Sequence, residues 1–249
     1  MKYLLILFLI CIGAQAEDEK QKITIGAGLY TQTQPYKNVD DIVLPSPVIF
    51  FDNSIVYVRW SRAGVYFLGE TKDDYAWGIS LTTQPRTYGY KSSDSDTLSG
   101  MDEKKNTWEA GIAFSAKTDK AYIEIMFLND ILNTHNSWMI KTEIGYDFRV
   151  GDFLLYPSLI IGYQSKEFLN YYYGVSQKEA ITSSHSEYSP DAGVQFGVQT
   201  YIKYPFTNSL ATLINIRADK LPNEATLSPL INDDYIYSGL VSLIYTFEY

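Results

Sequence analysis

The segment 136-NSWMIKTEIGYDFR-149 indicates the fold class most directly, because apolar residues occupy every second position along it. Successive side chains of a β-strand point to opposite faces, so this spacing predicts a strand with one apolar and one polar face. The polar face includes Lys141, Glu143, Asp147 and Arg149. Such a strand is typical of proteins that cross a membrane as a closed β-barrel.

Two further segments, 108–117 and 192–203, show the same alternation. Soluble β-sandwiches also alternate, because one face packs on a second sheet while the other meets water. The segment 241–249 favours the membrane barrel, since one of its faces is wholly apolar and its last residue is the aromatic Tyr249. A soluble protein with so apolar a terminal strand would be prone to aggregate.

The N-terminus is typical of a secretory signal peptide at residues 1–16. Lys2 supplies a positive charge, an apolar stretch follows at 3–13, and Ala14-Gln15-Ala16 fits a cleavage site. A membrane anchor would need about 18 or more apolar residues. We therefore expect residues 17–249 to form the exported domain, and the only cysteine, Cys11, to leave with the signal peptide.

We predict an all-β, transmembrane, antiparallel up-and-down barrel of about twelve strands, with ten as the alternative. Four connections are long, namely 31–46, 84–106, 165–189 and 220–234, whereas most others are short and polar. Bacterial barrels have short periplasmic turns and longer outer loops, so these four are predicted to lie outside. The predicted strands are 22–30, 47–52, 54–60, 63–69, 75–83, 107–118, 120–128, 136–149, 152–164, 190–204, 207–219 and 235–249.

Aromatic residues near predicted strand ends fit the two girdles of a membrane barrel. Tyr30, Trp60 and Trp108 fall near outer ends, and Phe148 and Tyr249 fall near inner ends. Amphipathic rings favour the headgroup level on both sides of a bilayer. The pattern supports a location in the outer membrane of a Gram-negative bacterium.

Charged residues on the polar faces are expected to point into the lumen. Both signs occur in similar number, so we predict ion pairs that fill a narrow lumen rather than a selective pore with one sign in excess. The predicted network consists of Glu109, Lys117, Glu124, Lys141, Glu143, Asp147, Arg149, Lys203, Arg217 and Asp219.

Several stretches resemble the MipA/OmpV family of outer-membrane proteins. They are 35-PYKNVDDIVLPSPVIFFDN-53, 88-YGYKSSDSDTLSGM-101, 171-YYYGVSQKEA-180, 227-LSPLI-231 and the ending 245–249. The resemblance extends in order over nearly the whole exported chain. It implies an outer-membrane barrel without a catalytic motif. It also implies a scaffold that links a murein hydrolase, a membrane-bound lytic transglycosylase, to a penicillin-binding synthase.

The residues themselves indicate no enzyme, cofactor or metal site. His135 and His185 fall in predicted outer loops, where we interpret them as a turn residue and a solvated residue. An acidic outer loop with Asp94, Asp96, Asp102 and Glu103 lacks the regular ligand spacing of a calcium site. Divalent cations could still bridge it to lipopolysaccharide.

The partners expected are outer-membrane lipid, lipopolysaccharide and murein enzymes. The chain has 29 acidic and 20 basic residues, and this balance argues against nucleic acid. Tyr171, Tyr172 and Tyr173 are candidates for an interaction surface, because exposed tyrosines are frequent at interfaces. Packing between loops is the equal alternative. A small-solute channel and an outer-surface adhesin are the alternative functions.

Overall fold

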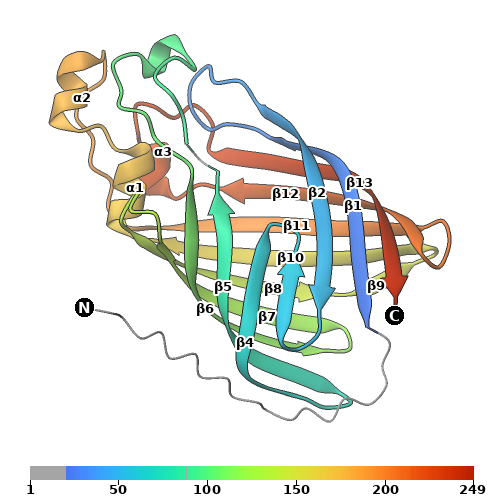
Figure 1. Ribbon diagram of the computed structural model, residues 1–249. Helices are drawn as coiled ribbons and strands as arrows, with labels where there is room; N and C mark the ends of the chain where they lie inside the picture. The colour runs from blue at the N-terminus through green and yellow to red at the C-terminus, as the bar shows by residue number, and fades with distance from the viewer. Residues whose placement is uncertain (1–20, 88) are drawn as a thin grey trace, which may run out of the picture.

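The computed structural model describes residues 21–87 and 89–249, so the predicted signal peptide lies outside the described residues. The described chain forms one antiparallel sheet of 13 strands, in the order β11-β12-β13-β1-β2-β3-β4-β5-β6-β7-β8-β10-β9. Pairing of β10 with β11 joins the two sides of this sheet and closes it into a barrel (Figure 1).

The strands are β1 (Lys22–Gln32), β2 (Ile42–Asp52), β3 (Val56–Arg59), β4 (Arg62–Thr71), β5 (Tyr75–Arg86), β6 (Thr107–Thr118), β7 (Ala121–Asp130), β8 (Trp138–Tyr146), β9 (Phe148–Val150), β10 (Phe153–Gln164), β11 (Gly193–Pro205), β12 (Leu210–Lys220) and β13 (Tyr235–Glu248). The short helices are η1 (Asp96–Leu98), α1 (Lys166–Tyr173), α2 (Gln177–Thr182) and α3 (Asn223–Thr226). Among the described residues, no helix is long and apolar enough to cross a membrane.

The prediction of twelve strands is confirmed, and the alternative of ten is wrong. β8 and β9 are consecutive pieces of one strand interrupted at Asp147, and both pair with β10, so the barrel has 12 strands. The predicted start of the second strand at residue 47 is too late, because β2 begins at Ile42 and runs through Pro45 and Pro47. Proline disfavours an inner strand because it cannot donate a backbone hydrogen bond, which explains the late prediction.

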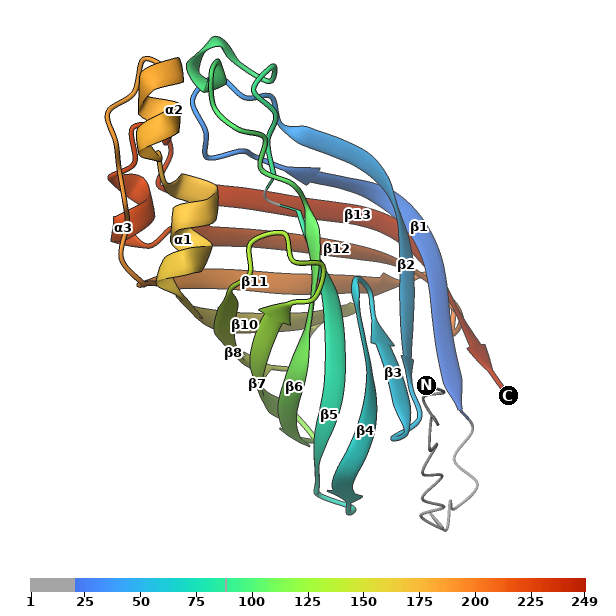
Figure 2. The same cartoon turned by 60° about the vertical axis from the view of Figure 1, so that its left-hand side comes forward.

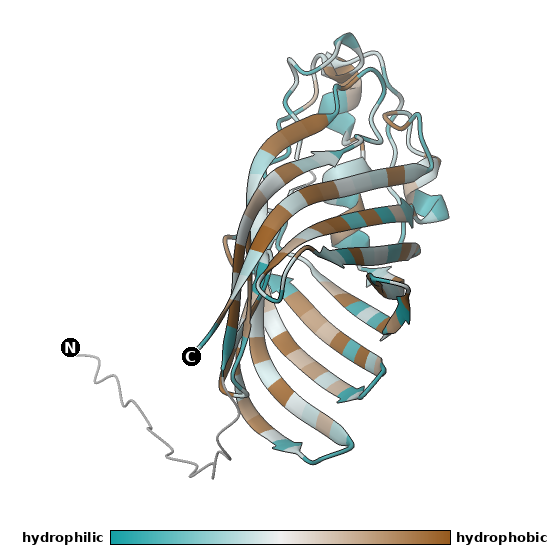
Figure 3. Cartoon of the chain, turned by 90° about the vertical axis from the view of Figure 1, so that its right-hand side faces the viewer, coloured by the Kyte–Doolittle hydropathy of each residue, from teal (hydrophilic) through white to brown (hydrophobic). Residues whose placement is uncertain are grey.

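The outer surface of the barrel is apolar. In β13 the outward residues Val241 and Leu243 are 58% and 52% exposed, whereas the inward Leu240 and Ile244 are 1% and 3% exposed. Figure 3 shows hydrophobic residues repeating along the outer face of neighbouring strands. So extensive an apolar surface suits lipid and not water.

The long connections gather at one end of the barrel, away from the C-terminus (Figure 1). They contain η1, α1, α2 and α3, and they pack on one another around a buried apolar cluster. We term this assembly of residues 33–41, 87–106, 165–192 and 221–234 the outer cap; residue 88 is outside the description. Its buried cluster consists of Tyr36, Tyr90, Leu98, Met101, Phe168, Leu169, Tyr172, Tyr173, Val175, Leu221, Ala225, Leu230 and Ile231, with Ile236 of β13 beneath.

Candidate functional site

The outer cap is an ordered structure rather than a set of free loops. The hydroxyl of Ser165 caps α1 by accepting the backbone N–H of Phe168, and Ser176 forms a capping box with Glu179 at the start of α2. Lys104 donates to the Glu179 carboxylate at 2.7 Å and so joins α2 to the segment 89–106. Burial alone would raise the pKa of Glu179, but the hydrogen bonds from Lys104 and Ser176 outweigh it and lower that pKa to about 2.

The three consecutive tyrosines lie on helix α1 inside the outer cap. Tyr172 and Tyr173 are fully buried, and Tyr171 is partly buried with its hydroxyl accepting the backbone N–H of Lys105 at 2.8 Å. Tyr173 stacks on Tyr36 with ring centroids 6.1 Å apart. Of the two interpretations that the sequence allowed, these positions favour packing between loops, because the buried rings are inaccessible to a partner.

His135 lies in the bend between β7 and β8, where the sequence places it as a turn residue, and its side chain is buried. Its side chain is 1% exposed and lies beneath α1, with its ring 5.4 Å from that of Phe168. Its Nδ1 is 2.5 Å from the hydroxyl of Ser137, and its Nε2 is 3.7 Å from Glu109. His185 is half-buried, and its Nε2 lies 2.6 Å from the carbonyl oxygen of Thr97. The His135 ring therefore contacts helix α1 of the outer cap, and the His185 ring joins the segments 165–192 and 87–106 of the cap.

Below the outer cap, the lumen holds a cavity of about 2380 Å³. Residues of the short turns line it at the periplasmic end, including Asn53, Ser54 and Asp73. At the outer end its lining includes Thr87 and Asn106 of the outer cap, but no residue of α1, α2 or α3. The lumen is thus accessible from the periplasmic end and covered by the cap at the outer end.

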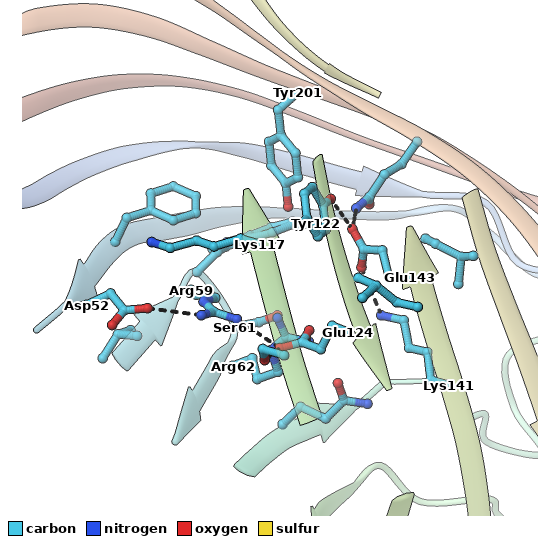
Figure 4. Close-up of a pocket in the computed structure, with 18 of the residues that line it drawn as sticks. Asp52, Arg59, Ser61, Arg62, Lys117, Tyr122, Glu124, Lys141, Glu143 and Tyr201 are labelled. Carbon is cyan, nitrogen blue, oxygen red and sulfur yellow. Dashed lines mark hydrogen bonds and ion pairs between the residues drawn. The ribbon is translucent and has the colours of Figure 1, made fainter. Parts of the chain in front are cut away.

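The main charge cluster of the lumen is centred on Glu124 of β7. Arg59 of β3 donates to Glu124 at 2.8 Å and to Asp52 at 2.9 Å, and Arg62 of β4 also pairs with Glu124 (Figure 4). Glu124 lies directly opposite Glu143 of β8 in the strand register. Like charges in opposite positions destabilise a sheet, so each carboxylate needs separate partners.

Glu143 obtains those partners from four strands. Its carboxylate accepts hydrogen bonds from Tyr122 at 2.7 Å, Gln199 at 2.8 Å and Ser158 at 3.0 Å, and Lys141 lies 3.9 Å away. Figure 4 shows Glu124 and Glu143 on neighbouring strands, with Tyr122 and Lys141 beside Glu143. The paired charges of this wall project into the lumen and narrow it.

Two more pairs lie nearer the outer cap. Arg86 binds Glu109 through two hydrogen bonds of 2.8 and 2.7 Å, and both side chains are buried. Arg217 binds Asp219 at 2.5 and 2.7 Å. Two parallel bonds between a guanidinium and a carboxylate are stronger than a single contact. Buried ion pairs of this kind are favourable only when fully hydrogen-bonded, as they are here.

The predicted network is therefore brought together only in part. Glu109, Glu124, Lys141, Glu143, Arg217 and Asp219 meet opposite charges inside the lumen. The other four form no ion pair within the described ranges: Lys117, Asp147, Arg149 and Lys203. Lys117 and Asp147 still line the cavity, and Arg149 is exposed.

Three arginines of the network were missed in the sequence. Arg59 and Arg62 flank the short β3–β4 turn, where the alternation is too brief to assign faces. The sequence places Arg86 in the predicted outer connection 84–106, but β5 extends to it. A signal was available for Arg86, because Gln84 and Arg86 continue the polar face of the preceding strand.

The other wall of the lumen is apolar. Strands β2, β12 and β13 contribute a buried cluster of Val48, Ala211, Leu213, Leu240 and Ile244, against which Tyr30, Phe50, Trp60 and Tyr201 pack. The prediction that Tyr30 and Trp60 belong to the outer girdle is therefore wrong. Trp108, by contrast, is 46% exposed on the outer face, as the girdle requires. Within residues 21–87 and 89–249, no group of three or more potential ligands could hold a metal ion.

Comparison with known proteins places this architecture among outer-membrane proteins. A family model described as MltA-interacting protein MipA matches residues 25–247. MltA-interacting protein of Escherichia coli K12 is 26% identical over 249 residues, which is 100% of this chain and 99% of that protein. Outer membrane protein OmpV of Vibrio cholerae is 28% identical over 170 residues, or 67% of this chain and 63% of that protein. The match to a solved outer membrane channel of Pseudomonas putida F1 covers 94% of this chain and 97% of the channel's chain, with 10% sequence identity and a TM-score of 0.44.

Proposed function

Because this chain belongs to the MipA family of outer-membrane barrel proteins, we propose that it acts as a scaffold for murein-remodelling enzymes. The observation that carries the proposal is the full-length match to a relative named for its interaction with MltA. We extend that role to a lytic transglycosylase and a penicillin-binding synthase on the periplasmic side. The proposal assigns the barrel no reaction of its own.

The positions of the outer cap and of the exposed residues at the opposite end of the barrel support a periplasmic partner. The outer cap covers the lumen on the outside, whereas the cavity is accessible from the periplasmic turns. The hairpin of β4 and β5 extends furthest from the cap (Figure 2). Its tip exposes Glu70, Lys72 and Asp73, and Phe67 and Leu68 are each 51% exposed nearby. This β4–β5 tip combines charge with apolar surface, which suits a protein contact.

Photocrosslinking in living cells tests the scaffold. A photoreactive amino acid would replace Lys72 or Asp73 at the β4–β5 tip, or Ser54 in the neighbouring turn. The matched control is Ile181 of α2 in the outer cap, which is 80% exposed. We expect adducts with a murein hydrolase or synthase from the periplasmic positions only. Adducts that contain neither enzyme, or equal yields from Ile181, would contradict the scaffold.

The outer cap argues against the alternative of an open solute channel. Conduction would require the packed apolar cluster of the cap to separate. We therefore expect planar-bilayer recordings of the folded protein to show little conductance. The apolar outer band is proposed to contact lipid in both leaflets and lipopolysaccharide in the outer one.

A further inference from the structure

The wall of the barrel is incomplete on one edge of β2. β2 pairs with β1 from Ile42 to Phe51, but its pairing with β3 covers only Phe50 to Asp52. The outermost backbone hydrogen bond on that edge joins the N–H of Trp60 to the carbonyl of Ile49 at 2.8 Å. Within the part of the chain that the structure describes, β2 has no strand partner on this side before Ile49.

The facing strand is unpaired at the same end. β4 begins at Arg62, and its first pairing with β5 joins Ala63 to Thr83, so residues 84–86 of β5 pair only with β6. Figure 2 shows the short β3 ending below the outer part of β2. We define the lateral gap as the opening bounded by residues 42–48 of β2, residues 84–86 of β5 and the turn at 60–61.

Proline removes the hydrogen-bond donors from the β2 edge of this gap. Backbone groups of alternate residues in a strand point to the same side. Because the carbonyl of Ile49 faces β3, the backbones of Pro45 and Pro47 face the gap. Neither has an N–H to donate. The hydroxyl of Ser46 donates to the carbonyl of Pro47 at 3.3 Å, so one acceptor on this edge is also satisfied locally.

The β5 edge has the same property. The carbonyl of Trp108 in β6 accepts a hydrogen bond from the N–H of Ile131, just after β7, so the backbone of Trp108 faces β7. The backbone of the next residue, Glu109, therefore faces β5, where it pairs with Gln84. The next residue, Pro85, therefore turns its backbone toward the gap and again lacks a donor. Prolines at exposed edges prevent another strand from pairing there. Both edges are thus suited to remain open and unsuited to receive a strand from a partner.

The lateral gap lies at the height of the apolar band. Pro45 is opposite Leu29 of β1, and Leu29 is opposite Val241 of β13. Leu29 and Val241 point outward and are 56% and 58% exposed. An opening at this level faces the hydrocarbon of the bilayer and not water.

The gap leads to the apolar wall of the lumen. Leu44 shares the inward face of β2 with Val48, but Leu44 is 42% exposed whereas Val48 is fully buried. Leu44 lines the lumen cavity together with Ile42, Phe50 and Trp60. Apolar side chains of β2 therefore line one side of the route from the gap into the barrel.

Trp60 forms the lower edge of the gap in a strained conformation. Its backbone φ of 56° lies in the left-handed region, which is costly for a bulky residue. Its indole N–H donates to the hydroxyl of Ser46 at 3.0 Å, and its ring packs edge-on against Tyr30 at 5.5 Å. These contacts hold the β3–β4 turn against the inner side of β2 and keep it from extending up the gap.

We propose that the lateral gap admits a hydrocarbon chain from the outer membrane into the apolar side of the lumen. The occupant is the acyl chain of an amphiphile, held between Leu44, Phe50 and Trp60. A membrane phospholipid and a free fatty acid share this chemistry. The proposal does not depend on the scaffold function, because it concerns the bilayer and not a periplasmic protein.

Photolabelling with two probes tests the proposal on the folded, full exported chain in lipid vesicles. One probe is palmitic acid with a diazirine near the chain end, and the other is a phosphatidylcholine with the same chain. We expect labels on Phe50, Trp60 or Tyr201, which face the lumen, and their loss when unlabelled palmitate competes. Labelling by both probes identifies membrane lipid as a source, whereas labelling by palmitate alone identifies a free amphiphile.

Matched variants separate the gap from the periplasmic mouth as the route of entry. Ser46→Trp fills the inner side of the gap, and Ser158→Trp places the same ring at another buried, lumen-facing serine in the closed wall. Lumen labelling should fall severalfold in Ser46→Trp and persist in Ser158→Trp. If Ser46→Trp does not fold, Leu44→Trp replaces it. Labels confined to outward residues such as Leu29, or equal labelling in both variants, would overturn the proposal.

Discussion

Replacing Phe168 by alanine should open the outer cap while the barrel stays folded. Phe168 is fully buried at the base of α1, with its ring centroid 5.0 Å from that of Tyr172 and 5.2 Å from the guanidinium carbon of Arg86. No strand of the barrel depends on this ring for its ladder hydrogen bonds. Loss of the Phe168 ring should therefore weaken the packing of the cap over the lumen.

The expected loss of cap stability follows from the complete burial of Phe168. Truncating a buried phenylalanine to alanine costs about 3–5 kcal/mol when the cavity cannot collapse. Each 1.4 kcal/mol changes an equilibrium constant about tenfold, so the open-cap population should rise on the order of 10² to 10³-fold. Ile181→Ala is the matched control, because Ile181 belongs to the same cap but is 80% exposed. Its effect should remain within about 0.5 kcal/mol.

Two measurements distinguish cap opening from loss of the barrel. Limited proteolysis should cut residues 165–192 much faster in Phe168→Ala than in Ile181→Ala, and planar-bilayer conductance should increase. The shift in SDS mobility between unheated and boiled samples should be unchanged, because it reports the closed barrel. Abolition of that shift without faster cleavage would refute the idea that the cap opens as a separate unit.

Three further outcomes are expected. The ionised form of Glu179 stabilises the cap above its ordinary pKa of 4.5, and this contribution should be lost as pH falls through the lowered pKa of about 2. Hydrogen exchange of α2 should become faster over this pH range. In Glu179→Gln this dependence of exchange on pH should be absent. Arg86→Ala should cost about 3–5 kcal/mol in urea unfolding, because it leaves the carboxylate of Glu109 buried without its ion pair, and the double variant with Glu109→Ala should recover part of this. Ser46→Ala should cost about 1–3 kcal/mol by leaving the indole N–H of Trp60 without its acceptor, and an unchanged unfolding midpoint would contradict the assigned contact.

The strands could be predicted because alternation is a local property of the chain. In 136–149 the period of two directly indicates which side chains face lipid, and the structure follows it from Trp138 to Tyr146. Prediction from alternation failed where a strand is not paired with a neighbour on both sides along its whole length. Pro45 and Pro47 lie within β2, and only the missing partner on that edge makes them compatible with a strand.

Six members of the lumen network could be anticipated in the same way. The inward positions of Glu124 and Glu143 follow from alternation, but their partners do not. Arg59 is separated from Glu124 by 65 residues, and only closure of the barrel brings the two together. Likewise, nothing local indicates that Tyr172 is buried, because its covering groups come from other loops.

By itself, the sequence determined an exported chain, an apolar outer face, about twelve strands and long connections at one end, because each follows from residue type and spacing along the chain. The tertiary structure alone decided that the connections pack into a cap, which arginine meets which carboxylate, and that β2 and β5 remain apart. Those features depend on residues that are distant in the sequence, and the closed sheet sets their positions.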